Sequence, residues 1–131
     1  MHERISFLSG NLRLEGIWQQ QSPTHAVVVT HPHPLYGGDM HNPVVATIAD
    51  SFARKGYSTL RFNFRGTGAS QGDYDDGPGE QNDLLCALNW VKARVTDQAS
   101  VAGYSFGAWV AAGAAAQGGL DAAPLMLISP P

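Results

Sequence analysis

A serine bracketed by two glycines is the most chemically informative feature of the sequence. Gly103, Ser105 and Gly107 form the pattern Gly-x-Ser-x-Gly within Val101–Ala108, where an apolar run meets a segment of small residues. A strand that turns sharply into a helix needs residues nearly without side chains two positions before and after such a serine. The hydroxyl then stands above the sheet, near the positive end of the helix dipole. The pattern predicts Ser105 as a nucleophile that attacks a carbonyl carbon; the alternative is a serine that only caps the helix.

A nucleophilic serine needs donors for the negative oxygen that forms during its attack. The backbone N–H of Phe106, the residue directly after Ser105, is one predicted donor. We expect the second donor in the loop His31–Gly38, which follows the third predicted strand. The two prolines of this loop have no N–H, so we assign the backbone N–H of His33, with Leu35 as the fallback.

Large side chains near these two segments are candidates for the substrate pocket. We predict that three residues contact the substrate: Leu35, Tyr36 and Tyr104. The competing interpretation of the two tyrosines is that they only pack against the protein.

The histidines of the same loop raise the hypothesis of a metal site. His31 and His33 lie two residues apart in an extended segment, His41 follows, and no convergent carboxylate accompanies them. We therefore predict neither a metal ion nor a cofactor.

The glycine-rich segment Arg65–Gly72 invites comparison with a dinucleotide-binding loop. Its glycines, Gly66, Gly68 and Gly72, are spaced one residue too widely for that fingerprint, and no helix opens directly after them. We interpret the segment as a loop whose glycines adopt positive φ angles.

An acidic cluster follows this loop. It comprises Asp73, Asp75, Asp76, Glu80 and Asp83. We interpret it as a solvated loop and as negative charge at a helix N-terminus, because a calcium site of the EF-hand type would need a regular ligand spacing that is lacking. Cys86, in the helix predicted next, is expected in the core.

The elements that must position these residues follow from hydrophobic periodicity and turn signals. Strands are predicted at Arg4–Leu8, Leu12–Gln19, Ala26–Thr30, Tyr57–Phe64, Gln98–Ala102 and Pro124–Ser129. Helices are predicted from Asn42-Pro43 to Gly56, over Glu80–Arg94 and over Phe106–Gln117. An antiparallel hairpin followed by β-α-β-α-β-α-β predicts an α/β fold in three layers, with a mostly parallel sheet and helices on both faces. The whole chain, 1–131, is predicted to be one domain.

Composition and charge exclude several classes of protein. The chain has 131 residues and a formal net charge of −3, with no run of Lys or Arg, so we expect no nucleic-acid partner. The N-terminus lacks a signal-peptide pattern, and no apolar run approaches the ~20 residues of a membrane span. The single cysteine allows no internal disulfide. We therefore expect a cytoplasmic protein without a membrane partner.

Three motifs in this order resemble a known family. They are His31-Pro-His-Pro-Leu-Tyr-Gly-Gly38, Phe62-Asn-Phe-Arg-Gly-Thr-Gly-Ala-Ser70 and Gly103-Tyr-Ser-Phe-Gly-Ala108. The chain resembles the small, cap-less α/β-hydrolases related to dienelactone hydrolases. The resemblance implies Ser105 as nucleophile, a structural role for His31, and a loop His31–Gly38 that completes the oxyanion hole. Dienelactone hydrolase has a cysteine in place of this serine, so its substrate is not transferred.

The sequence departs from that family in its catalytic acid and base. The family places both after later strands, whereas beyond Ser105 this sequence has Asp121 as its one acid and has no histidine. We therefore expect the N-terminal part of a hydrolase of about 200 residues, without the last strands of the fold. Little esterase turnover is expected of it, and an uncovered sheet edge predicts homo-oligomers or aggregation.

The resulting functional hypothesis is a serine hydrolase of small-molecule esters or thioesters. The alternatives are a non-catalytic α/β-hydrolase-like module that binds a ligand, and an acyltransferase on the same scaffold.

Overall fold

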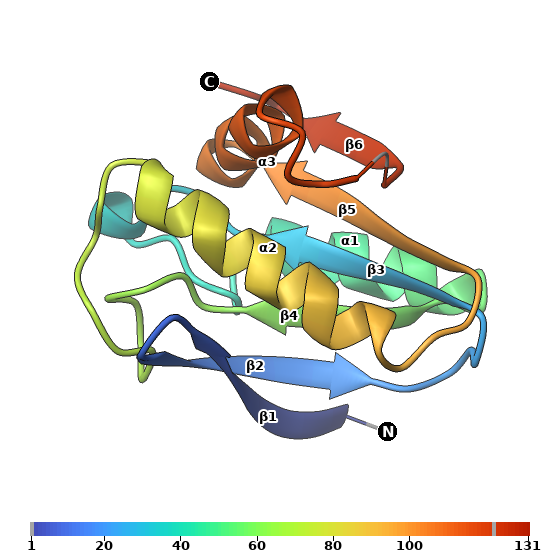
Figure 1. Ribbon diagram of the computed structural model, residues 1–131. Helices are drawn as coiled ribbons and strands as arrows, with labels where there is room; N and C mark the ends of the chain where they lie inside the picture. The colour runs from blue at the N-terminus through green and yellow to red at the C-terminus, as the bar shows by residue number, and fades with distance from the viewer. Residues whose placement is uncertain (1, 122) are drawn as a thin grey trace.

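A single mixed sheet organises the chain in the computed structural model, which describes residues 2–121 and 123–131 (Figure 1). The strand order is β1-β2-β4-β3-β5-β6. The strands are β1 (His2–Ser9), β2 (Leu12–Gln19), β3 (His25–Thr30), β4 (Ser58–Phe62), β5 (Gln98–Tyr104) and β6 (Leu125–Ile128). The helices are α1 (Pro43–Arg54), α2 (Pro78–Lys92), α3 (Phe106–Ala116) and the short 3-10 helix η1 (Pro34–Tyr36).

The direction of the strands matches the sequence prediction. β1 and β2 form an antiparallel hairpin, and β2 is also antiparallel to β4. β3 is parallel to both β4 and β5, and β5 is parallel to β6. β3 lies between two parallel neighbours, and its valines Val27, Val28 and Val29 are fully buried, as expected for a strand covered on both faces.

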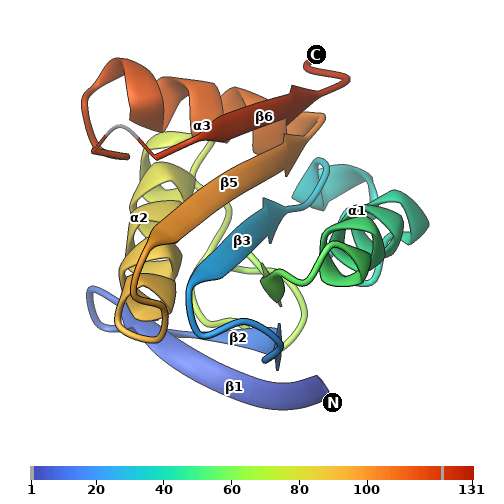
Figure 2. The ribbon, with the colours of Figure 1, turned by 90° about the vertical axis from the view of Figure 1, so that its right-hand side faces the viewer.

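Helices cover the sheet on both sides. Figure 2 shows α1 on one face and both α2 and α3 on the other, so the three-layer α/β prediction is confirmed. One apolar cluster, which includes Phe62 and Leu88, lies on the α2 and α3 side. A smaller cluster, which includes Val45 and Ile48 of α1, lies on the opposite side.

Local signals placed the helix ends well. The Asn42 side chain caps α1 by accepting from the N–H groups of Val44 and Val45, at 2.9 and 3.4 Å. α2 begins two residues earlier than predicted, at Pro78. No helix among the described residues has the length and apolar character needed to cross a membrane.

The glycine-rich loop after β4 has the predicted backbone. Gly66, Gly68 and Gly72 all adopt positive φ angles, of 76°, 55° and 89°. Within the acidic cluster, Glu80 lies in the first turn of α2, as predicted for negative charge at a helix N-terminus. The expectation of solvent exposure is wrong for Glu80 and Asp83, because both are fully buried.

Buried partners explain why these two carboxylates leave water. Arg65 donates to Asp83 at 2.8 Å, and the Ser9 hydroxyl donates to the same carboxylate at 2.6 Å. Glu80 accepts from the N–H of Gly77 at the start of α2, at 2.9 Å. Cys86 is only partly buried and packs against the edge of the core. The Arg65–Asp83 pair joins the loop after β4 to α2, and this fixes where the loop beside the candidate site begins.

Candidate active site

Ser105 occupies a strained turn between β5 and α3. Its φ and ψ angles are 56° and −118°, a conformation that costs a residue with a side chain about 1–3 kcal/mol. Backbone hydrogen bonds hold the turn: the Ser105 N–H donates to Ile128 at 2.9 Å, and its carbonyl accepts from Ala108 at 2.9 Å. The Ser105 side chain makes no capping hydrogen bond and is half-buried, so its hydroxyl is not engaged as a helix cap.

The two glycines that flank Ser105 are required by close backbone approaches. A Cβ on Gly107 would lie 2.6 Å from the carbonyl oxygen of Thr30, at the end of β3. A Cβ on Gly103 would lie 2.6 Å from the carbonyl oxygen of Gly107. The steric reason given from the sequence for both glycines is therefore confirmed.

The loop after β3 lies beside this turn. Its short helix η1 begins after His33, whose ring centroid lies 4.9 Å from that of Phe106. Among the described residues, no acceptor pairs with the backbone N–H of either His33 or Phe106. The fallback donor is engaged, because the Leu35 N–H donates to Nδ1 of His33 at 3.2 Å. Of the predicted donors, His33 and Phe106 are thus the two with free N–H groups.

His31 is a buried link between β3 and β4. Its Nε2 accepts from the Phe64 N–H at 3.1 Å, so Nδ1 carries the proton and donates to the Pro32 carbonyl at 2.7 Å. Desolvation by burial lowers the pKa of His31 from 6.5 to about 4. The ring is neutral with both nitrogens engaged, which agrees with the structural role implied by the family resemblance.

The three predicted substrate contacts do not share one environment. Leu35 and Tyr36 are 64% and 85% exposed on the loop after β3. Tyr104 is half-buried and packs against the apolar cluster on the α1 side of the sheet. The structure therefore brings Tyr36 to His33, with 4.7 Å between ring centroids, whereas Tyr104 points to the α1 side of the sheet.

The sequence analysis missed two aromatic residues near Ser105, Tyr74 and Trp109, which pack against the ring of Phe106. Phe106 lies at the centre of an aromatic cluster, with its ring centroid 5.8 Å from Phe64, 5.9 Å from Tyr74 and 5.6 Å from Trp109. Trp109 is 45% exposed. Desolvation, followed by a hydrogen bond to Asp76, raises the pKa of Tyr74 to about 12. A tyrosine within an otherwise polar Asp/Gly loop was the signal that could have identified Tyr74.

Among the residues that the structure describes, none is bonded to Ser105 as a general base would be. The Ser105 hydroxyl forms no hydrogen bond with any histidine that the structure describes. His25 lies at the start of β3, where Nε2 is 3.5 Å from Asp97, and it is separated from the far end of that strand by about 17 Å. Within residues 2–121 and 123–131, no three His, Cys, Asp or Glu side chains gather as a metal site.

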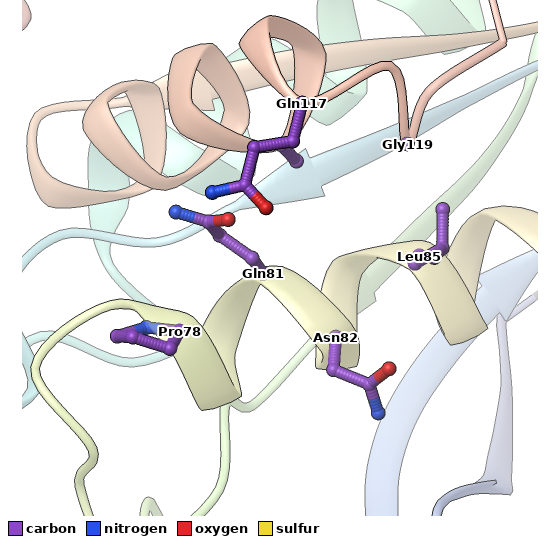
Figure 3. Close-up of a pocket in the computed structure, with 7 residues that line it drawn as sticks. Pro78, Gln81, Asn82, Leu85, Gln117 and Gly119 are labelled. Carbon is purple, nitrogen blue, oxygen red and sulfur yellow. The ribbon is translucent and has the colours of Figure 1, made fainter.

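A hollow of about 230 Å³ lies between α2 and the end of α3 (Figure 3). Figure 3 shows the amide groups of Gln81 and Gln117 turned toward each other across it. Its lining is Pro78, Gln81, Asn82, Leu85, Ala114, Gln117 and Gly119. No titratable side chain lines the hollow, and α3 separates Gln117 from Ser105 by about 18 Å along the helix axis. It is therefore not the candidate active site.

Comparison with solved structures defines the class of protein. The chain is 38% identical to an α/β serine hydrolase without a lid from Xanthomonas campestris, with a TM-score of 0.86. It is 33% identical to an α/β serine hydrolase homologue from Coxiella burnetii, with a TM-score of 0.84. The matches cover 99% and 97% of this chain, but 62% and 73% of those chains. The fold and its neighbours are those of α/β serine hydrolases, which confirms the predicted class.

A family model and a sequence relative extend this result. Residues 13–129 match the model of the X-Pro dipeptidyl-peptidase (S15) family, and the chain belongs to that family. An uncharacterized protein from Rickettsia prowazekii is 43% identical over 112 residues, which are 82% of this chain and 47% of that protein. The chain thus spans about half the length of this relative. A Pyrococcus furiosus esterase matches at 25% identity and a TM-score of 0.73, over 85% of this chain and 44% of the esterase.

Proposed function

We propose that the chain forms the nucleophile-bearing part of a serine hydrolase that cleaves small-molecule esters or thioesters. Ser105 is the nucleophile, and the backbone N–H groups of Phe106 and His33 bind the developing oxyanion. The conformation of Ser105 carries the proposal, because a φ of 56° at a non-glycine residue is costly and clusters at functional sites. The free N–H groups of Phe106 and His33 support it.

The proposed reaction proceeds through an acyl-enzyme. Ser105 Oγ bonds to the carbonyl carbon as a base removes its proton, and the two N–H groups stabilise the negative oxygen. Collapse of this intermediate breaks the bond to the alcohol or thiol, which leaves with a proton, and water then hydrolyses the acyl-serine.

We propose that the base belongs to a longer form of the protein. The Xanthomonas hydrolase that matches 99% of this chain has 38% of its own length outside the match, the complement of the 62% that is covered. Residues 1–131 alone should then retain only what an oxyanion hole and binding supply, ~10³–10⁴-fold over water.

Peptide cleavage is the second candidate function. The family model is named for an X-Pro dipeptidyl-peptidase, whereas a structural neighbour is named as an esterase. Amide and ester hydrolysis share the acyl-enzyme, so the same Ser105 serves both. Parallel assays with p-nitrophenyl acetate and Gly-Pro-p-nitroanilide distinguish them, and we expect faster release from the ester.

Labelling with a fluorophosphonate probe tests the nucleophile. The probe is applied to the longer form of the protein, which supplies the base. There we expect the probe on the peptide that contains Ser105, no labelling of Ser105→Ala, and unchanged labelling of Ser51→Ala, whose serine lies exposed on α1. Equal labelling of Ser105→Ala would contradict the assignment. If the longer form stays unlabelled, a non-catalytic binding module is favoured, and acyl transfer to an added alcohol would instead indicate an acyltransferase.

A further inference from the structure

A chain of hydrogen bonds runs from the loop after β4 to the loop after β3. The Tyr74 hydroxyl lies 3.1 Å from Nε2 of His33 and donates to Oδ1 of Asp76 at 2.9 Å. On its other side, His33 accepts the Leu35 N–H through Nδ1 at 3.2 Å. His33 is the residue whose backbone N–H is assigned to the oxyanion hole.

The directions of these bonds are determined by their partners. Because Nδ1 of His33 accepts from Leu35, it is unprotonated, and a neutral ring carries its proton on Nε2. Nε2–H therefore donates to the Tyr74 oxygen, and the Tyr74 O–H donates to the Asp76 carboxylate. Each donor in this series of hydrogen bonds has one acceptor, and together the bonds fix the plane of the His33 ring.

Ring packing holds the same histidine from two further sides. Ring centroids of Tyr36 and Tyr74 lie 4.7 and 5.1 Å from that of His33, and the Phe106 ring is 4.9 Å away. The His33 carbonyl also accepts from Tyr36 and Gly38, at 3.1 and 3.0 Å. The backbone of His33 is thus held by its ring and by its carbonyl, while its N–H stays free.

The far end of the chain of bonds is anchored on α2. Asp76 has a φ of 55°, a left-handed conformation that is uncommon for a residue with a side chain. The residues before and after Asp76 are both bonded to the buried Glu80, which accepts from the N–H groups of Asp75 and Gly77 at 2.8 and 2.9 Å. Asp76 is therefore presented to Tyr74 by a turn fixed to the start of α2.

We infer that Tyr74 and Asp76 are positioning residues, which hold His33 so that its backbone N–H faces an oxyanion on the carbonyl attacked by Ser105. The inference rests on the proposed function and deepens it. Removing the Tyr74 hydroxyl frees the ring of His33 to turn while leaving the nucleophile and Phe106 intact. His33 itself loses one neutral hydrogen bond, so the rate at Ser105 should fall about tenfold, less than the 10²–10³-fold cost of losing an oxyanion donor outright.

Four variants test this inference. Tyr74→Phe keeps the aromatic packing and removes the hydroxyl, and Asp76→Ala removes its acceptor. Asp76→Asn is the conservative rescue, since its amide oxygen can accept the same bond and asparagine tolerates a positive φ. Tyr57→Phe is the matched control, because Tyr57 directly precedes the start of β4 and packs on the α1 side.

Two measurements are made on each variant, after its melting temperature shows that it is folded. Nitrogen-15 NMR reports the His33 tautomer and its backbone amide. In the wild type we expect the proton on Nε2, and in Tyr74→Phe and Asp76→Ala a shifted His33 amide and faster solvent exchange of the ring N–H. In the longer form that supplies the base, the rate of fluorophosphonate labelling of Ser105 should fall about tenfold in these two variants, and remain near that of the wild type in Asp76→Asn and Tyr57→Phe.

The outcomes distinguish failure of the proposed function from failure of the inference about Tyr74 and Asp76. An unlabelled wild-type protein in the longer form that supplies the base would overturn the proposed function and the inference with it. A labelled wild type with an unchanged rate in Tyr74→Phe, or a His33 ring protonated on Nδ1, would overturn the inference alone. Asp76→Asn behaving like Asp76→Ala would also overturn it, because an accepting oxygen would then not be what Asp76 contributes.

Discussion

β5 has a neighbour on each side, and the two sides are packed very differently. Toward β3, its pairs Val28–Val101 and Thr30–Gly103 are buried, and the turn of Ser105 rests on the end of β3. Toward β6, Met126 and Leu127 are 49% and 41% exposed. The interior side of β5, toward β3, thus supports the candidate site. The outer margin, formed by β6, is open to solvent.

The margin also leaves a groove on the α1 side of the sheet. A hollow of about 330 Å³ lies between α1 and β6, with an apolar lining that includes Ile48, Phe52, Met126 and Ile128. A parallel sheet is normally covered on both faces, and Figure 2 shows α1 lying over β3 and β4 rather than over β6. The residues around Ser105 are therefore held in place by the interior strands. Substitutions there should lower the free energy of unfolding far more than substitutions beside β6.

Gly107→Ala should strongly destabilise the fold. Its Cβ would lie 2.6 Å from the backbone oxygen of Thr30, so α3 and β3 must separate, at a cost of about 3 kcal/mol in the free energy of unfolding. Urea denaturation measures the change. Gly113→Ala is the matched control in the same helix, since its Cβ would meet only the flexible amide end of Gln81, and it should be neutral or stabilising. Equal destabilisation by both substitutions would contradict a tightly packed interior.

Acidification should destabilise the interior through His31. Its pKa is about 4 in the folded chain and 6.5 in the unfolded reference, so the unfolded state binds more protons between these values. The free energy of unfolding is then highest above about pH 6.5 and falls as the pH drops, by about 2 kcal/mol between pH 7 and pH 5. Denaturant titrations across this range measure the slope, and a flat profile would mean that His31 is not held neutral.

Met126→Ala should have the smallest effect. The side chain is half exposed at the margin, and its truncation should cost less than about 1 kcal/mol in the free energy of unfolding. Leu60→Ala on β4 is the interior counterpart, where a fully buried leucine should cost about 2–5 kcal/mol. The same denaturation assay compares them, and a similar cost for both would remove the distinction between interior and margin. Association through the β6 edge remains a prediction, which sedimentation of the wild type can check.

Features encoded by neighbouring residues were predictable. Alternating strands and helices, the Asn42 cap and the positive φ angles of the glycine-rich loop follow from periodicity and local backbone preferences. The turn at Ser105 was likewise predictable, because the glycines two residues before and after it indicate that neighbouring backbone segments pack too closely for a side chain.

Features that depend on distant partners were not predictable. Asp83 was expected in solvent, and its burial depends on Arg65 and on Ser9, which is 74 residues away in the sequence. Tyr74 reaches His33 across 41 residues, a separation that carries no periodic signal. The packing of Tyr104 against the apolar cluster on the α1 side was not anticipated either, whereas its contact with a substrate stays a prediction.

The sequence by itself determined the order of the elements, the strand-to-helix turn at Ser105 and the loop that faces it. These properties arise from short-range sterics, glycine geometry and hydrophobic periodicity, which act within a few residues. The tertiary structure alone decided that His31 is neutral and engaged, that His33 has a free N–H, and that Tyr74 links the His33 ring to Asp76 by hydrogen bonds. Desolvation and hydrogen-bond direction produce these properties, and both depend on which distant segments the sheet brings together.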